Sequence, residues 1–238
     1  MSKAVPALFL AFVAVILSYA FAHRSGEPKP ATGVQIETTM IMSAAPVGTA
    51  RVAVGGRGRI FRQDDAKSPW VAVKSPTEAT LTRVHFLDGQ NGLIVGHDQV
   101  ILRTADGGKT WKQVFIDAAA ETPLFDVVQL DATRALAIGA YGLFLETVDG
   151  GTTWSSRFIL PEGEDRHLNA IAKLVDGTLM IAGEAGTILR STDAGATWQK
   201  VESPYAGSYF GVQPMAGTQV LMYGMRGHVP RSDDNGAA

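Results

Sequence analysis

The sequence predicts an all-β fold, a β-propeller of four-stranded antiparallel blades, and three observations lead to this prediction. A short segment that ends in tryptophan recurs about every forty residues, a period typical of solenoids and propellers. Short apolar runs separated by Gly, Asn and Asp recur four times within each period, as in the blades of a propeller. No window beyond the N-terminal apolar run has a helical period of apolar residues.

The recurring segment is clearest at residues 104–111, 147–154 and 191–198, which share the pattern Ser/Thr-x-Asp-x-Gly-x-Thr-Trp. A degenerate copy occupies residues 63–70, and a partial copy occupies residues 232–238. Successive aspartates of the five copies are 41, 43, 44 and 41 residues apart. The positions that define the segment are Asp65, Trp70, Asp106, Gly108, Trp111, Asp149, Gly151, Trp154, Asp193, Gly195, Trp198 and Asp234.

The second repeat shows the expected strands of a blade, at residues 81–87, 92–95, 100–103 and 111–116. The same plan predicts strands at 36–42, 51–54, 59–61 and 70–73 in blade one, at 124–130, 135–138, 143–145 and 154–159 in blade three, and at 168–175, 179–182, 187–189 and 198–201 in blade four. The fifth repeat supplies three strands. We therefore expect four complete blades and a truncated fifth.

A glycine ends the second strand of every repeat. Such a glycine suits either a tight turn with positive φ or a close approach of two backbones. The five positions are Gly55, Gly96, Gly139, Gly183 and Gly224.

The recurring segment is the Asp-box, or BNR repeat, and its residue types have structural uses. An aspartate side chain can accept hydrogen bonds from the amides that follow it and so hold a turn. The glycine can take a positive-φ turn position, and the tryptophan can cover the hairpin with a large apolar face. Equivalent aspartates of different blades point outward around a ring, so we expect no catalytic or metal-binding role for them.

Residues 183–198, with their counterparts at 139–154 and 96–111, resemble the photosystem II stability/assembly factor-like family of propellers. The resemblance covers roughly residues 34–238. It implies a seven-bladed, non-enzymatic propeller in the lumen or periplasm that helps to assemble or stabilise a membrane complex, without implying photosynthesis. Seven blades would need about 90 further residues, and a five-bladed ring with an incomplete closing blade is the alternative.

The N-terminus predicts export. Residues 4–22 are mostly apolar, and Ala20-Phe21-Ala22 fits a signal-peptidase site. The run is also long enough to remain as an uncleaved membrane anchor. We expect residues 1–22 to be the signal peptide or anchor, residues 23–33 a linker and residues 34–238 the propeller, placed in the periplasm or cell envelope.

Composition excludes several kinds of site. The chain has no cysteine, so it has neither disulfides nor thiolate metal sites. Its formal net charge of −2 argues against non-specific binding of nucleic acid. We expect no metal and no cofactor, because the histidines fall in different repeats without metal-ligand spacing. They are His85, His97, His167 and His228, with His23 near the cleavage region.

A carbohydrate-binding or glycoside-hydrolysing propeller is the alternative function, because Asp-boxes also occur in sialidases. Such enzymes need convergent carboxylates and arginines, and the sequence lacks the Arg-Ile-Pro signature of sialidases. Glu162, Glu164 and Asp165 lie together in one inter-blade loop, where a solvated acidic loop is the simpler interpretation. We expect no catalytic residues.

Arginines offer the clearest partner-binding hypothesis. Arg62, Arg103, Arg190 and Arg231 share one position of the third strand, where blade three has Glu146. Each could instead pair with an acid of its own hairpin or cover a tryptophan. Arg57 and Arg59 lie in a turn of blade one, and Arg226 occupies the matching turn of the fifth repeat. We hypothesise that Arg57, Arg59 and Arg226 dock an acidic segment of a membrane protein or membrane-associated complex.

Overall fold

The computed structural model describes residues 35–237. The predictions for the signal peptide or anchor at 1–22 and for the linker at 23–33 lie outside these residues. Within 35–237, no helix is long and apolar enough to cross a membrane.

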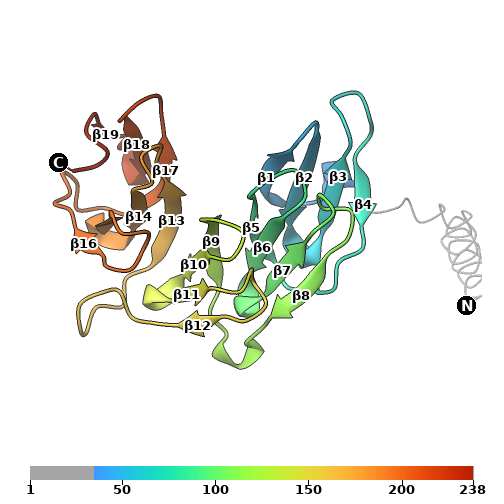
Figure 1. Ribbon diagram of the computed structural model, residues 1–238, viewed down its shortest axis with the longest axis horizontal. Coiled ribbons are helices and arrows are strands. Elements are labelled where there is room, and N and C mark those ends of the chain that lie inside the picture. Colours follow the sequence, from blue (N-terminus) through green and yellow to red (C-terminus); the bar gives the residue numbers. More distant parts are fainter. Residues whose placement is uncertain (1–34, 238) are drawn as a thin grey trace, which may run out of the picture. The chain divides into compact units, whose positions relative to one another are not determined.

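Five antiparallel sheets follow one another along the chain, and in each the strands pair in sequence order (Figure 1). Blade one contains β1 (Ile41–Val47), β2 (Ala50–Gly55), β3 (Ile60–Gln63) and β4 (Val71–Val73). Blade two contains β5 (Leu81–Phe86), β6 (Gly92–Gly96), β7 (Ile101–Thr104) and β8 (Lys112–Phe115). Blade three contains β9 (Leu124–Gln129), β10 (Ala135–Gly139), β11 (Phe144–Thr147) and β12 (Ser155–Ser156). Blade four contains β13 (Leu168–Lys173), β14 (Leu179–Gly183), β15 (Ile188–Ser191) and β16 (Gln199–Lys200). Blade five contains β17 (Tyr209–Pro214), β18 (Val220–Gly224) and β19 (Arg231–Ser232). The predicted fold class, with four complete blades and a three-stranded fifth, is confirmed.

Short 3-10 turns are the only helical elements among residues 35–237. They are η1 (Ile36–Thr38), η2 (Gly56–Gly58), η3 (His97–Gln99), η4 (Ala118–Ala120), η5 (Ala140–Gly142), η6 (Glu184–Gly186) and η7 (Met225–Gly227).

The first strand of blade one lies further along the chain than the sequence predicts. We expected it at 36–42, but residues Ile36–Thr38 form η1 and the strand begins at Ile41. The connection to β2 explains the difference. Val47 pairs with Ala50 across a tight turn in which Gly48 has a φ of +62°. That turn fixes the register of the hairpin, so residues 41–47 pair with β2 and residues 36–40 do not.

The outer strands of blades three and four are also shorter than predicted. β12 and β16 have two residues each, against predictions of 154–159 and 198–201. One further ladder bond continues each edge, from the Arg157 amide to the Phe144 carbonyl (3.2 Å) and from the Val201 amide to the Ile188 carbonyl (2.9 Å). Because the strand residues of β12 and β16 are exposed, burial does little to enforce regular pairing there.

The core lies between successive blades. The innermost strands pack in the order β1, β5, β9, β13 and β17, and each buried apolar cluster joins residues of two neighbouring blades. Every residue of β6, β10 and β14 is buried. This double burial explains why the second strands read as continuous apolar runs instead of alternating patterns.

Polar side chains on the inner strands join one blade to the next. Thr82 Oγ1 of β5 donates a hydrogen bond to the Leu124 carbonyl of β9 (2.7 Å). At the matching position of β13, Asn169 Nδ2 donates to the Tyr209 carbonyl of β17 (2.7 Å). Each bond satisfies a carbonyl at the start of the following inner strand, so it fixes the spacing of neighbouring blades.

Asp126 of β9 connects three blades through one carboxylate. It is buried, and Arg83 Nε of β5 lies 2.8 Å from its Oδ1. Oδ1 also accepts from the Val127 amide (2.8 Å), and Oδ2 accepts from the Ile171 amide of β13 (3.0 Å). Burial raises the pKa of Asp126, while Arg83 and the two amides oppose that shift. The group is thus a buried anchor between blades two, three and four.

Candidate partner-binding surface

The Asp-box of blade two shows how the recurring segment is held. Asp106 Oδ1 accepts hydrogen bonds from the amides of Lys109 (3.0 Å) and Thr110 (2.9 Å) and from the Thr104 hydroxyl (2.8 Å). Its Oδ2 accepts from the Thr110 hydroxyl (2.6 Å). All these donors belong to the same hairpin, so the carboxylate is saturated by its own turn.

These bonds lower the pKa of the Asp-box carboxyl groups. The pKa of Asp149 falls to about 2, chiefly through the hydroxyl of the threonine four residues later, and that of Asp193 does so for the same reason. Around Asp106, burial alone would raise the pKa, but the hydroxyl and amide donors outweigh it and lower the value to about 2. A carboxyl group with such a pKa is ionised at neutral pH and is a poor general acid.

The degenerate and partial copies keep part of this arrangement. Asp65 accepts from the amides of Lys67 (2.8 Å) and Ser68 (2.9 Å), and the Ser68 hydroxyl lowers its pKa. In blade five, Asp234 accepts from the Ser232 hydroxyl (2.6 Å). Trp70, which precedes β4, is half-buried.

The Asp-box tryptophans pack between blades. Trp111 belongs to the buried cluster between blades one and two, and its Nε1 donates to the Gly108 carbonyl (3.2 Å). Trp154 packs against the cluster between blades two and three and donates likewise to the Gly151 carbonyl (3.3 Å). The glycines have φ of +82° and +85°, values that disfavour any residue with a side chain.

Arginines of the third strands reach into the next blade. Arg62 Nε of blade one donates to the Gly107 carbonyl in the Asp-box of blade two (3.1 Å). Arg190 Nε of blade four donates to the matching Asn235 carbonyl of blade five (3.0 Å). We name these contacts the inter-blade latches. The local alternative also holds in part, because Arg62 pairs with Asp64 and Arg231 pairs with Asp233, each an acid of the same hairpin. The bond to a carbonyl of the following blade was not predicted.

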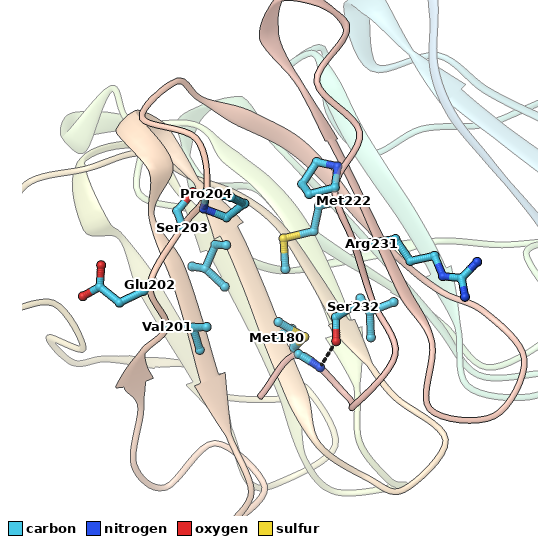
Figure 2. Close-up of a pocket in the computed structure, with 12 residues that line it drawn as sticks. Met180, Val201, Glu202, Ser203, Pro204, Met222, Arg231 and Ser232 are labelled. Carbon is cyan, nitrogen blue, oxygen red and sulfur yellow. Dashed lines mark hydrogen bonds between the residues drawn. The ribbon is translucent and has the colours of Figure 1, made fainter. Parts of the chain in front are cut away.

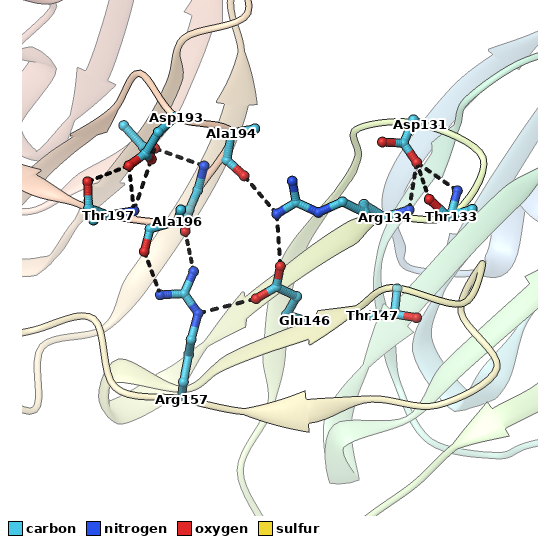
Figure 3. A network of polar contacts seen from close by, with 12 residues as sticks. Asp131, Thr133, Arg134, Glu146, Thr147, Arg157, Asp193, Ala194, Ala196 and Thr197 are labelled. Carbon is cyan, nitrogen blue, oxygen red and sulfur yellow. Dashed lines mark hydrogen bonds and ion pairs between the residues drawn. The ribbon is translucent and has the colours of Figure 1, made fainter.

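Blade three, where Glu146 replaces the arginine, makes the latch with two other arginines (Figure 3). Arg134 Nη2 contacts Glu146 Oε1 (2.9 Å) and donates to the Ala194 carbonyl (3.0 Å). Arg157 Nε contacts Glu146 Oε2 (3.3 Å), and its terminal nitrogens donate to the carbonyls of Gly195 and Ala196. Glu146 therefore lies between two guanidinium groups and orients both toward the Asp-box of blade four.

The turn after each second strand has a common geometry that places Arg57 and Arg226. The strand-ending glycines are extended, with φ between −148° and −175°. A Cβ added to Gly139 would lie 2.2 Å from the Pro123 carbonyl oxygen, so close backbone approach is the reason for glycine there. The positive φ falls two residues later. It occurs at Arg57, Asp98, Tyr141, Ala185 and Arg226, with φ between +50° and +58°.

Arg57 and Arg226 are thus exposed side chains at one position of the same turn, in the first and fifth blades. Arg57 and the exposed Arg59 line an open polar groove of about 800 Å³, which also contains Lys74 and Glu78. Arg226 does not line this groove. The structure therefore brings Arg57 and Arg59 together and places Arg226 on a separate blade.

The acidic inter-blade loop and the histidines form no constellation typical of catalysis. Glu164 lies 3.9 Å from Lys200 Nζ, and Glu162 and Asp165 are exposed. Among residues 35–237, no group of three His, Cys, Asp or Glu side chains could hold a metal ion. His167 Nδ1 accepts a hydrogen bond from the Tyr141 amide (3.0 Å).

Sequence reasoning missed two groups of residues. Arg83 and Asp126 were overlooked because the repeat does not mark them. They occupy the same position of their inner strands, and the other inner strands have small residues at this position. Arg134 and Arg157 were also overlooked. Their signal was present in the single replacement of arginine by Glu146, which invites a search for a compensating cation nearby.

Comparison with known proteins connects this architecture to one family. The family model described as "Photosynthesis system II assembly factor YCF48" matches residues 62–131 and 115–238. The "Photosystem II assembly lipoprotein Ycf48" of Prochlorococcus marinus (strain MIT 9313) is 42% identical over 144 residues, which are 59% of this chain and 42% of that protein. The match thus spans less than half the length of this curated relative.

Solved structures with the same fold include both a binding protein and an enzyme. The structure "YCF48 bound to D1 peptide" has a TM-score of 0.65 and 17% identity, covering 86% of this chain and 66% of that one. The GH74 enzyme of Niastella koreensis has a TM-score of 0.58 and 16% identity, covering 83% of this chain and 30% of that one. At these identities, the likenesses show the fold alone.

Proposed function

The chain belongs to the Photosynthesis system II assembly factor YCF48 family, and from this membership we propose that it is a non-enzymatic, exported scaffold that helps to assemble or stabilise a membrane protein complex. The family match carries the proposal. It is supported by the solved relative described as bound to a D1 peptide, which is a propeller of this fold holding a segment of another protein. The partner of this chain is a membrane or membrane-associated protein.

The proposed contact consists of the groove lined by Arg57 and Arg59, together with Arg226 at the matching turn of blade five. We call these three arginines the basic turn surface. Guanidinium groups bind carboxylates through paired hydrogen bonds, which suits them to an acidic peptide segment. The latch arginines are less suited to this role, because Arg62 and Arg190 already donate to carbonyls of the neighbouring blade. Arg57 and Arg59 also line one open groove of about 800 Å³, where Lys74 adds a third positive charge.

Export is proposed from the apolar run at residues 4–22 and from the lipoprotein names of the relatives. The 238 residues contain no cysteine, so these residues offer no thiol for a lipid attachment. We propose that the apolar run itself either directs export and is removed or remains as the anchor. Immunoblotting of membrane and periplasmic fractions, with the N-terminus of the mature protein sequenced, distinguishes these two outcomes.

The docking proposal is tested by reversing charge. The variant Arg57→Glu/Arg59→Glu/Arg226→Glu should fold normally and lose co-purification of membrane partners from detergent extracts. Arg51→Glu is the matched control, since Arg51 is exposed at the opposite end of β2 from the Arg57 turn. Circular dichroism checks the fold of both proteins. Undiminished capture by the triple variant would refute the docking surface, and equal loss with Arg51→Glu would show that only general charge matters.

The alternative of a carbohydrate-active propeller comes from the Asp-boxes, which also occur in sialidases, and the GH74 enzyme of Niastella koreensis shares the fold. The Asp-box carboxyl groups do not support it, because hydrolysis needs one protonated acid and a pKa of about 2 leaves them ionised. We expect no turnover of a panel of chromogenic glycosides. Turnover above that of a heat-denatured sample would overturn the scaffold proposal.

A further inference from the structure

His167 connects the turns of two neighbouring blades. It lies directly before β13, and its Nδ1 accepts a hydrogen bond from the amide of Tyr141 (3.0 Å), which belongs to η5 of blade three. Its own amide donates to Glu184 Oε2 in η6 of blade four (3.2 Å), and its carbonyl accepts from the Glu184 amide (2.9 Å). One residue therefore binds both turns.

The imidazole can accept the bond from Tyr141 only in its neutral form. Nδ1 has a free lone pair when the ring proton is on Nε2, whereas both nitrogens of an imidazolium are donors. Protonation of His167 would therefore set an N–H group against the Tyr141 amide, which is also a donor. Histidine is the side chain that ordinarily changes its charge between pH 5 and 8. The charge of this ring thus decides whether the Tyr141 bond forms.

The internal repeat contains the same turn with an acceptor that does not titrate. Ser208, directly before β17, occupies the position of His167, and its Oγ accepts from the Ala185 amide in η6 (3.4 Å). In both turns, the amide of the following glycine also binds a backbone carbonyl just before the next inner strand, 2.9 Å away. The two turns therefore differ in the acceptor for one amide, which is a hydroxyl in one and an imidazole in the other.

Hydroxyl groups also hold the connection between blades four and five. Ser203, which Figure 2 shows in this connection, accepts from the Tyr205 amide (3.1 Å), and its Oγ lies 2.9 Å from the hydroxyl of Tyr209. The ring of His228 stacks on Tyr205, with centroids 3.8 Å apart, and leaves the Ala185 amide to its serine acceptor. A serine hydroxyl does not ionise between pH 5 and 8, so the Ala185 turn keeps its acceptor throughout that range.

Three charged residues adjoin His167. Glu184 in η6 binds its amide through a carboxylate oxygen. Asp165 and Arg166 precede it in the chain, are exposed and have opposite charges. An imidazolium would therefore have the Glu184 carboxylate beside it, whereas its contact with the Tyr141 amide would become one between two donors.

Tyr141 depends on His167 for more than one contact. Its ring meets the imidazole edge-on, with centroids 4.8 Å apart, and Phe125 of β9 contacts the same imidazole at 6.0 Å. Tyr141 is nevertheless 63% exposed. Its φ of +54° lies in the left-handed region, which is unfavourable for a residue with a side chain. An exposed residue with such a φ is easily displaced once its amide loses its acceptor.

We propose that His167 is a pH-sensitive switch for the Tyr141 turn. A neutral imidazole binds the turn amide and supports the tyrosine ring, and an imidazolium releases both. The turn position is the one that Arg57 and Arg226 occupy in other blades, so acidification changes the same face of the propeller. The switch acts within this chain, so it can hold or fail independently of the basic turn surface.

Nuclear magnetic resonance of the full chain, labelled with ¹⁵N, tests the switch. The rate at which the Tyr141 amide exchanges with water is divided by the rate for the Ala185 amide, so that the general dependence of exchange on pH cancels. This ratio should rise about fivefold to tenfold as pH falls from 8 to 5, as expected when a turn loses one hydrogen bond. The rise should follow the titration of the His167 ring resonances. A constant ratio would overturn the proposal.

Exchanging the two acceptors assigns the effect to His167. His167→Ser gives the Tyr141 turn the acceptor that the Ala185 turn has, and the ratio should then stay constant with pH. Ser208→His makes the reverse exchange and should render the Ala185 amide sensitive to pH. Circular dichroism checks both folds. A ratio that still rises in His167→Ser would refute the assignment.

His97→Ser is the matched control, because His97 is exposed at the start of η3, on a turn of the same kind. It should keep the full pH dependence of the Tyr141 amide, and its loss would show that the general charge of this face causes the change. If the His167 variant misfolds, the unmodified chain decides. There the ratio must change at the pH where the His167 ring titrates, and a midpoint more than one pH unit away would refute the switch.

Discussion

Replacing Glu146 with arginine should destabilise the protein, although arginine is the residue that the other four repeats carry at that position. In blade three the carboxylate separates Arg134 and Arg157, both of which bind carbonyls of the next Asp-box. A third guanidinium at this point would remove both ion pairs and add repulsion between like charges.

The magnitude follows from the exposure of the pairs. The Glu146 side chain is 20% exposed and its partners about a third or less, so each charged hydrogen bond is worth about 1–2 kcal/mol after allowance for solvent. Losing both costs about 2–4 kcal/mol, and repulsion brings Glu146→Arg to about 3–5 kcal/mol. In a domain of this size, the melting temperature should fall by roughly 10 °C.

Restoring the neighbouring pattern should rescue the variant. The triple change Glu146→Arg/Arg134→Thr/Arg157→Val gives blade three the residues that blade four has at these positions, namely Arg190, which makes a latch, Thr178 and Val201. It removes the two competing cations and leaves one arginine to make the latch.

Calorimetry and urea unfolding followed by circular dichroism measure all three proteins. We expect the triple variant to regain at least half of the stability that Glu146→Arg loses. An unchanged melting temperature for Glu146→Arg would refute the compensating role of Glu146. A triple variant less stable than the single one would refute the equivalence of the two latches.

Three further predictions concern the hairpins and the inner strands. Because the folded pKa of Asp149 is about 2, below its ordinary 3.8, its contribution to stability is complete above pH 4 and is lost as pH falls toward 2; Asp149→Asn should flatten this part of a plot of unfolding free energy against pH. Gly139→Ala should cost about 2 kcal/mol or more in urea unfolding, through its contact with the preceding inner-strand segment, whereas Gly89→Ala, in open space, should stay within about 0.5 kcal/mol. Asp126→Ala should cost about 3 kcal/mol in the same assay, because it leaves Arg83 and an inner-strand amide without their acceptor, and a loss below 1 kcal/mol would contradict its role as an anchor.

The fold was predictable because its information is repeated. One Asp-box predicts little, but several copies at a constant spacing fix the blade and its strand order together. The predicted strand boundaries were wrong where a local turn or solvent exposure, rather than the repeat, determines the length of a strand. The Gly48 turn shifted the first strand of blade one, and solvent exposure shortened β12 and β16. Neither effect changes the apolar pattern that the sequence displays.

The connections between blades were not predictable in the same way, because a repeated position such as that of Arg62 and Arg190 does not show which atom about 40 residues away it contacts. Asp126 reads as a polar interruption of an inner strand, and only the structure shows that its charge meets Arg83 and the Ile171 amide. The strand-ending glycines left two explanations open. The φ values of the structure select close backbone approach, since positive φ occurs two residues later, where Arg57 and Arg226 stand.

The latch arginines and the turn arginines differ in what they contact, and this difference bears on where a partner can bind. A latch arginine is held by a carbonyl of the next blade, and releasing it would break an inter-blade contact, so Arg62 and Arg190 serve the fold before any ligand. The turn itself does not require arginine at this position, because Ala185 and Tyr141 adopt the same φ in other blades. A position that tolerates alanine, tyrosine and arginine at one φ is free of structural demands on its side chain. This freedom is consistent with the proposal that Arg57 and Arg226 contact a partner, and the charge-reversal variant tests it.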